Sequence, residues 1–458
     1  MTSIHLAYLI TTILSLCSFG FGAPLEDYNN IFDESTRWEL HEICQNTQYK
    51  IHWIKLQSLK WRNDNEVDQP IWTHWLTIIQ PSDVEFDSAL LFVEGGNQDS
   101  LQPSPSQLKK LVDAAVSTHS IICQLRMIPA QPLKFHDEMD PRYIEEGRKE
   151  DALLAYSWDK FLTTREPEWI IRLPMTKAIA KAMDAIQEYG SLHLDIPVNS
   201  FILTGASKRG WACWTAAAID SRVKALIPLV IAPFHIKESF TRHWMAYGEW
   251  SPAIRDYLAI DLPSKWTSEA FKELMQIEEM NNYLDRLMMP KYLINATGDE
   301  FFLPDGSQHY FPGLMGPKHL RNVPNMDHKI DQSDAMQSIL AYYQTILRGQ
   351  PLPSVNWTKR EDGTLEVFTS QKPLQATLWQ ASNPVGRDFR VSTIGKTWTS
   401  APLSANAEGV YQVALEEPEE GWRAYFVELT FDTDHHIPLK ITTDVFVVPD
   451  VFPFTAPQ

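Results

Sequence analysis

The stretch FILTGASKRGW, residues 201–211, gives the strongest indication of the fold. An apolar, strand-like run leads through Gly205 and Ala206 to Ser207, and a helix-like segment follows at once. A serine on such a sharp turn is pushed out from the edge of a parallel sheet, with the amino terminus of the helix aimed at it. Small neighbours are needed because the tight backbone leaves little room for Cβ atoms. The stretch therefore predicts an α/β fold with Ser207 as a nucleophile.

This turn departs from the usual G-x-S-x-G pattern at one position. Arg209 stands where the last glycine is expected, and Gly210 comes one residue later. The same residues approach a phosphate-binding G-x-x-x-x-G-K loop, but Trp211 replaces the required lysine, so we reject a phosphate site. We expect Lys208 and Arg209 on a solvated helix face rather than in an anion site.

Strand-like and helix-like segments alternate on both sides of this turn, after two antiparallel strands within residues 50–80. The alternation predicts a mostly parallel sheet covered by helices on both faces over residues 23–349. Residues 231–289 interrupt the alternation with helical periodicity and many aromatic residues. We interpret this insertion as a cap, with Trp244, Tyr247 and Trp250 as candidates to line a substrate pocket; helices packed on the sheet edge are the alternative.

The segment 350–458 has a different pattern. Short runs rich in Val, Thr, Phe, Tyr and Trp are separated by turns, for example LEVFT, QATLWQ and WRAYFVELTF. This pattern predicts a carboxy-terminal all-β sandwich module of about seven strands.

An acid and a base should follow the nucleophile in the order Ser, Asp, His. Asp299 comes directly after the strand PKYLINATG, with Glu300 and Asp305 as rivals. His328 lies in the next strand-to-helix loop, before the last long helix. The sequence thus predicts a Ser207–His328–Asp299 triad, in which His328 takes the proton of Ser207 and Asp299 holds the imidazole.

An oxyanion hole needs two backbone donors. The N–H after the nucleophile, that of Lys208, supplies one. The loop after the strand LLFVEGGNQ supplies the other, with Gly96 and Asn97 as candidates. Because the chain has neither a His-x-x-x-His pair nor paired cysteine spacing, we expect no metal and no cofactor.

Composition limits the partners. The 458 residues carry a formal net charge of −18, with 44% hydrophobic and 21% charged residues. This charge argues against nucleic acid as a partner, since such proteins need concentrated positive charge. We expect a small-molecule ester or a peptide as the substrate, and a cell-surface receptor is an alternative partner.

The first residues indicate export. Residues 1–22 contain no Asp, Glu, Lys or Arg, are mostly apolar from Leu6 on, and end in small residues, so they predict a signal peptide cleaved after Gly22. We expect a secreted protein (periplasmic in a bacterium) without a membrane span in the mature chain. Cys44, Cys123 and Cys213 remain, of which the last two are expected to be buried thiols, and Asn356 in Asn-Trp-Thr is a candidate glycosylation site.

Several of these stretches resemble one family. The turn TGASKRGW, with FVEGGN, EDALLAYSWDKFL, YLDRLMMPKYLINATGDEFFLPD, VPNMDH and GWRAYFVELTF, is similar to the PhoPQ-activated pathogenicity-related family of the α/β-hydrolase superfamily, over most of residues 30–450. The resemblance implies an exported hydrolase-like domain followed by a β-domain, with nucleophile, acid and base at Ser207, Asp299 and His328. It implies no substrate, and some secreted relatives are described as growth-repressing signals.

Two functions therefore remain open. The first is a secreted serine hydrolase that acts on carboxylic esters, with a peptidase as its nearest variant. The second is a secreted, non-catalytic signalling or binding protein, like a proliferation repressor, that keeps the hydrolase scaffold.

Overall fold

The computed structural model describes residues 23–194 and 196–457. The predicted signal peptide, residues 1–22, lies outside the described residues. The parallel centre of the sheet is formed by six strands in the order β5-β4-β6-β7-β8-β9. These strands are β4 (Ser88–Val93), β5 (Ile122–Leu125), β6 (Ser200–Ala206), β7 (Val223–Leu229), β8 (Lys291–Ala296) and β9 (Lys318–Val323). The predicted α/β-hydrolase-like fold with a mostly parallel sheet is confirmed.

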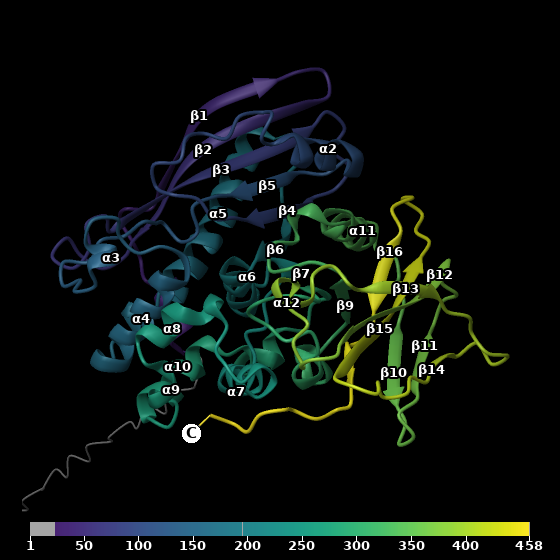
Figure 1. Ribbon diagram of the computed structural model, residues 1–458. Coiled ribbons are helices and arrows are strands. Elements are labelled where there is room, and N and C mark those ends of the chain that lie inside the picture. Colours follow the sequence, from purple (N-terminus) through teal and green to yellow (C-terminus); the bar gives the residue numbers. More distant parts are fainter. Residues whose placement is uncertain (1–22, 195, 458) are drawn as a thin grey trace, which may run out of the picture.

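Antiparallel strands extend this sheet at its β5 end. They are β1 (Arg37–Gln45), β2 (Tyr49–Lys60) and β3 (Ile71–Pro81), of which the last two are the predicted antiparallel pair. Figure 1 shows them at the top of the molecule, beyond β5.

Helices cover both faces of the sheet, and neighbouring residues of one strand point to opposite faces. In β6, Leu203 packs in the hydrophobic cluster beneath α4 (Glu150–Thr164), α5 (Arg172–His193) and α6 (Lys208–Ile219). Its neighbour Ile202 packs in the cluster with α2 (Lys109–Thr118) and α11 (Ala335–Leu347). A strand buried on both faces reads as a continuous apolar run, which is why residues 201–203 are all apolar. Short helices α1 (Ala23–Asn30), α3 (Pro141–Ile144) and α12 (Val391–Ile394) complete the set outside the cap.

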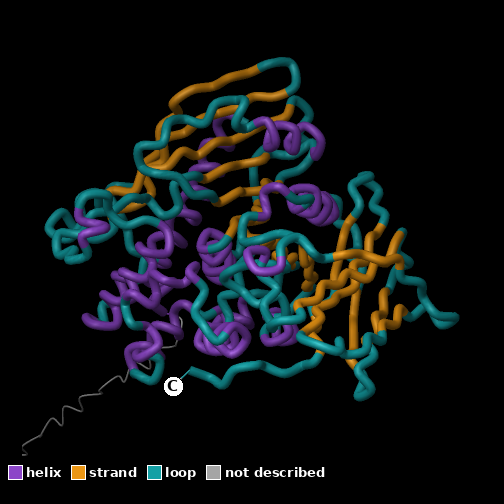
Figure 2. Tube along the Cα trace, in the orientation of Figure 1, coloured by secondary structure: helices purple, strands orange, loops and turns teal. Residues whose placement is uncertain are grey.

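The segment between β7 and β8 is a helical cap, as predicted. It contains α7 (Ile236–Tyr247), α8 (Arg255–Ala259), α9 (Leu262–Lys265) and α10 (Glu269–Glu278), followed by a 3₁₀ helix at Met280–Arg286. Figure 1 labels these helices at the lower left and lower centre, near α4, and Figure 2 shows the same region formed mainly by helices. Cys123 and Cys213 are buried thiols, as expected, and burial raises their pKa values.

The carboxy-terminal strands form a sandwich that is joined to the central sheet. The central sheet continues past β9 through β16 (Leu439–Thr442), β15 (Trp422–Phe431), β12 (Gln375–Asn383) and β13 (Thr399–Pro402), with β17 (Phe446–Val448) also paired to β15. A second sheet of β10 (Val355–Lys359), β11 (Leu365–Thr369) and β14 (Tyr411–Val413) packs against it in one hydrophobic cluster. The sequence predicts a module behind a linker, with a boundary at residues 349/350. In the structure both parts share one sheet, which runs from β9 into β16, and the boundary stays a prediction.

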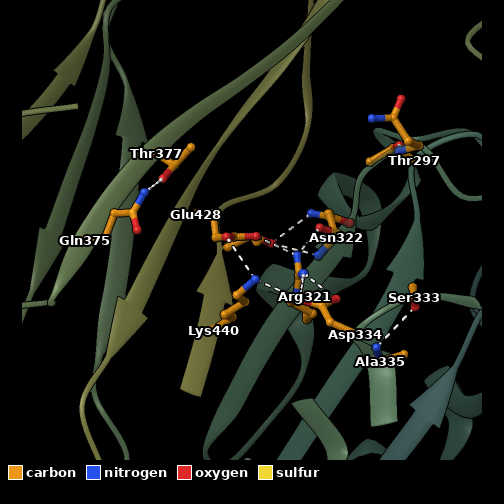
Figure 3. Close-up of polar contacts among 12 residues, drawn as sticks. Thr297, Arg321, Asn322, Ser333, Asp334, Ala335, Gln375, Thr377, Glu428 and Lys440 are labelled. Carbon is orange, nitrogen blue, oxygen red and sulfur yellow. Dashed lines mark hydrogen bonds and ion pairs between the residues drawn. The ribbon is translucent and has the colours of Figure 1, made fainter. Parts of the chain in front are cut away.

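Buried charges support this junction (Figure 3). The Arg321 guanidinium on β9 donates to Glu428 on β15 (2.7 Å) and to Asp334 before α11 (2.9 Å). Lys440 on β16 donates to the same Asp334 at 2.7 Å. The carboxylates therefore hold two cations from neighbouring strands, one on each side of the junction.

The end of the chain returns to the cap. The segment 449–457 runs from the β module along the lower edge of the molecule to the cap helices (Figure 1). The backbone N–H of Phe454 donates to the carbonyl of Met245 in α7 at 3.1 Å. The Phe452 ring lies over Arg242 of α7 and over Arg387 of the β module. The tail thus links α7 to the carboxy-terminal strands.

Candidate active site

Ser207 lies between β6 and α6 in a strained backbone conformation. Its φ is 56° and its ψ is −132°, a region that costs a non-glycine residue on the order of 1–3 kcal/mol. Its own N–H donates to the carbonyl of Leu229 at the end of β7, 2.8 Å away. The sharp strand-to-helix turn expected from the sequence is therefore present.

Gly210 explains the departure of this turn from the usual pattern. A Cβ on Gly210 would lie 2.5 Å from the carbonyl oxygen of Gly205 and 2.9 Å from Cγ2 of Ile231. A Cβ on Gly205 would lie 3.0 Å from the carbonyl oxygen of Val93. The close approach of α6 to β6 is thus made by Gly205 and Gly210, so position 209 is free to carry an arginine.

The candidate base and acid contact each other directly. Nδ1 of His328 lies 2.8 Å from Oδ2 of Asp299, which is buried and whose other oxygen accepts the N–H of Phe301 at 2.7 Å. The rivals have other partners: Glu300 accepts the backbone N–H of His328 (3.1 Å), and Asp305 is paired with Arg387 (2.7 Å). Of the three acids, only Asp299 is in position to hold the imidazole.

The surroundings of His328 suit a general base. Burial alone would lower the pKa of His328, but the negative charge and hydrogen bond of Asp299 outweigh it, and the pKa is raised above its ordinary value. Nε2 is buried and has no hydrogen-bond partner among the described residues. The Phe301 ring packs against the imidazole with centroids 4.5 Å apart. With Nδ1 directed at Asp299, Nε2 of the neutral ring is available to accept a proton.

Ser207 and His328 line the same hollow at the carboxyl edge of the parallel strands, together with Gly95, Gly205 and Arg209. The sequence predicts Ser207 and His328 from segments more than a hundred positions apart, and the structure places both at one edge. A direct contact between Ser207 and His328 stays a prediction.

Comparisons with known proteins agree with the resemblance seen in the sequence. The sequence model of the family described as PhoPQ-activated pathogenicity-related protein matches residues 25–390. The chain belongs to this family. Autocrine proliferation repressor protein A from Dictyostelium discoideum is 34% identical over 474 residues, which cover 97% of this chain and 94% of that protein.

Two solved structures are also similar to this family member. An acetyl xylan esterase from Paenibacillus sp. R4 is 14% identical with a TM-score of 0.48, over 70% of this chain and 92% of that chain. A glucuronoyl esterase from Solibacter usitatus is 12% identical with a TM-score of 0.43, over 73% and 92% of the two chains.

The oxyanion-hole candidates of this family member differ in their positions. Lys208 is the first residue of α6, so its N–H belongs to the positive end of the helix. The N–H of Asn97 donates to Oγ of Ser100 at 3.0 Å, which contradicts the predicted role of Asn97. Gly95, one residue before Gly96, lines the hollow instead. The turn at Ser100 directs the Asn97 amide away from the hollow, which the Gly95-Gly96 pair in the sequence did not reveal. The role of Gly96 in the oxyanion hole stays a prediction.

A second pocket under the cap is also lined by Ser207. Helix α7 contributes Ile236, Ser239, Phe240 and His243 to its wall. The predicted Trp244, Tyr247 and Trp250 are not among its lining residues: Trp250 packs behind Phe240, and the Tyr247 ring is covered by Arg390. The sequence identified the cap but selected the wrong face of α7, because the largest aromatic residues support the helix from behind.

The sequence also missed a group of charges beside the nucleophile. Lys208 is buried, and its Nζ pairs with Glu150 (2.9 Å) and Asp151 (3.1 Å) at the start of α4. Arg209 also pairs with Glu150, and both cations lower the pKa of this carboxyl although burial alone would raise it. The expectation of a solvated face for Lys208 and Arg209 is therefore wrong. No local pattern signals this contact, since the acids lie more than fifty residues earlier.

Two further findings bear on possible partners. Among the described residues, no three His, Cys, Asp or Glu side chains are grouped so that they could hold a metal ion. Over the same residues, none of the helices combines the length and the apolar character needed to cross a bilayer.

Proposed function

We propose that this protein is an exported serine hydrolase that acts on carboxylic esters. The observation that carries the proposal is the 2.8 Å contact of Asp299 with His328, because His328 lines the same hollow as the strained Ser207. This arrangement supports a triad in which Ser207 is the nucleophile, His328 the base and Asp299 the orienting acid.

The chemistry follows from this arrangement. Ser207 Oγ attacks the acyl carbon while Nε2 of His328 takes its proton, and Asp299 stabilises the imidazolium that forms. The N–H of Lys208 binds the developing oxyanion together with a backbone amide of the Gly95–Gly96 turn. His328 then gives its proton to the leaving alkoxide, and water hydrolyses the acyl-enzyme by the reverse steps. A peptidase would use the same groups, with an amine as the leaving group.

The test uses a fluorophosphonate probe, which labels activated serines covalently. We expect the purified protein to be labelled and Ser207→Ala to be unlabelled. Ser191→Ala, which removes an exposed serine at the end of α5, is the matched control and should be labelled like the wild type. A folded wild type that is not labelled would refute the proposal.

A second function is supported by the relative named a proliferation repressor. In this case the protein acts as a secreted signal through a cell-surface receptor, and Ser207→Ala keeps full growth-repressing activity in a cell-proliferation assay. Deletion of the β module is a poor test, because β16 pairs with β9 and Glu428 is the partner of Arg321.

Export would also allow glycosylation in a eukaryotic host. The candidate Asn356 is exposed on β10, where a glycan could be accommodated. Endoglycosidase treatment should lower the mass of the wild-type protein from such a host and should leave the mass of Asn356→Gln unchanged.

A further inference from the structure

The two hollows beside Ser207 differ in the residues that form them. The open hollow contains His328, with Glu94, Lys110, Lys329 and Asp331 around it. The pocket under the cap shares Ser207, Lys208, Asp151 and Phe301 with the open hollow, but His328 does not line it. Ser207 thus stands at the boundary between an open hollow and a capped pocket.

The proposed reaction assigns the two halves of an ester to these two hollows. In the first step, a bond forms between Ser207 Oγ and the acyl carbon, and the bond from that carbon to the alcohol oxygen breaks. The proton taken from Ser207 passes from His328 to the departing alcohol oxygen, so the alcohol must lie on the side of His328. Since the open hollow is then occupied by the alcohol, the acyl group lies in the pocket under the cap.

The wall of the capped pocket is mainly apolar. Its apolar residues come from the sheet side, from α4 and α6 and from the cap, and include Leu154, Trp158, Trp211, Ile231, Phe240 and Ile254. The charged lining residues are Lys208 and Asp151, which pair with each other. The second oxygen of Asp151 accepts the hydroxyl of Tyr257 at 3.0 Å. A charged acyl group would therefore lose its hydration without gaining a partner.

His243 provides a neutral polar group in this wall. Its side chain is 3% exposed, and burial lowers its pKa to about 4, so the ring is neutral at pH 7. The carbonyl of Glu300 faces the ring, although neither ring nitrogen has a hydrogen bond of normal geometry with a described residue. A neutral imidazole has one donor and one acceptor nitrogen. Because both ring nitrogens are buried, His243 presents an uncharged ring to the pocket rather than a free hydrogen-bonding atom.

We propose that the pocket under the cap binds the acyl half of the ester, as an uncharged, mainly apolar group. The alcohol half lies in the open hollow beside His328. This inference rests on the proposed hydrolase function and adds the substrate class to it.

The first experiment varies the acyl group with a constant 4-methylumbelliferyl leaving group. We expect kcat/KM to rise from the acetate to the phenylacetate by at least about tenfold, because each buried methylene contributes about 0.8 kcal/mol, or roughly fourfold. The hydrogen succinate ester should be at least about tenfold worse than the uncharged butanoate. A flat acyl series, or a preference for the succinate, would overturn the inference.

Variants of α7 test the pocket itself. Ser239→Phe places a ring in the pocket and should lower kcat/KM for the phenylacetate while sparing the acetate. Leu374→Ala, an exposed site in the β module, is the control and should leave all ratios unchanged.

Fluorophosphonate labelling separates the two levels of proposal. An unlabelled wild type overturns the hydrolase function. If the variants are labelled but their kcat/KM ratios between acyl groups are unchanged, only the assignment of the acyl group to the capped pocket is overturned. A variant that is not labelled is replaced by Ala232→Phe, which fills the same pocket from the loop after β7.

Discussion

Gly210→Ala tests whether the close packing of α6 on β6 positions the nucleophile. Two effects of opposite sign act here. Alanine favours a helix by about 1 kcal/mol over glycine. Against this, the new Cβ would lie 2.5 Å from the carbonyl oxygen of Gly205, which is backbone and cannot rotate away. Overpacking costs about 1–3 kcal/mol, and a backbone contact this short belongs at the upper end. We therefore expect a net loss of about 2 kcal/mol in the free energy of unfolding.

The same substitution should impair labelling of Ser207. To relieve the contact, the start of α6 must move by about 1 Å, the separation that restores an ordinary van der Waals distance. A displacement of about 1 Å can reduce a catalytic rate by about 10²-fold. The assay is the rate of fluorophosphonate labelling at a temperature where circular dichroism shows the variant folded. Thermal unfolding, followed in parallel, reports stability.

Gly313→Ala is the matched control. No atom lies within 4 Å of a Cβ at Gly313, and its φ is not positive. Its stability should stay within about 0.5 kcal/mol of the wild type. If Gly210→Ala and Gly313→Ala behaved alike in stability and in labelling rate, the reasoning about the turn would be refuted.

Three further predictions concern the base, the sheet junction and the tail. His328 acts in its neutral form and its pKa is raised, so the rate of ester hydrolysis should fall as the pH drops through a value above about 6.5. In Asp299→Asn the burial of His328 remains and lowers its pKa, so this fall in rate should move to lower pH, with a rate loss of about 10⁴-fold. A fall at the same pH as in the wild type would contradict the role of the carboxylate. Arg321→Leu removes the cation that lies 2.7 Å from the buried Glu428, leaving only the partly exposed Lys440 3.6 Å away, and should cost about 3–5 kcal/mol in chemical denaturation. Lys440→Met, at a partly exposed site, should cost at most about 1 kcal/mol, and equal losses would contradict a dominant role of the buried pair. Deletion of residues 450–458 removes the contacts of the tail with α7, so hydrogen exchange should become faster in α7 than in α5. Equal changes in the exchange of the two helices would contradict this role of the tail.

The sequence by itself determined the order of the elements and indicated the candidate reactive groups. Continuous apolar runs such as residues 201–203 indicate strands buried on both faces, and helical spacing between them indicates the crossovers. The small residues around Ser207 indicate the turn, because only a tight turn requires them so close together. Asp299 and His328 follow successive strands, and parallel strands end at the same edge of a sheet. These are local signals, carried by spacing within about ten residues.

Tertiary structure alone decided which neighbours each side chain meets. Lys208 is buried because Glu150 and Asp151, from another helix, compensate its charge. Phe240 and His243, rather than Trp244 or Tyr247, face the pocket because the rotation of α7 is fixed by what packs behind it. The β module joins the central sheet because the free edge of β9 pairs with β16 and Arg321 finds its carboxylate on β15. Each of these outcomes depends on burial and charge pairing between residues far apart in the chain, which no local spacing encodes.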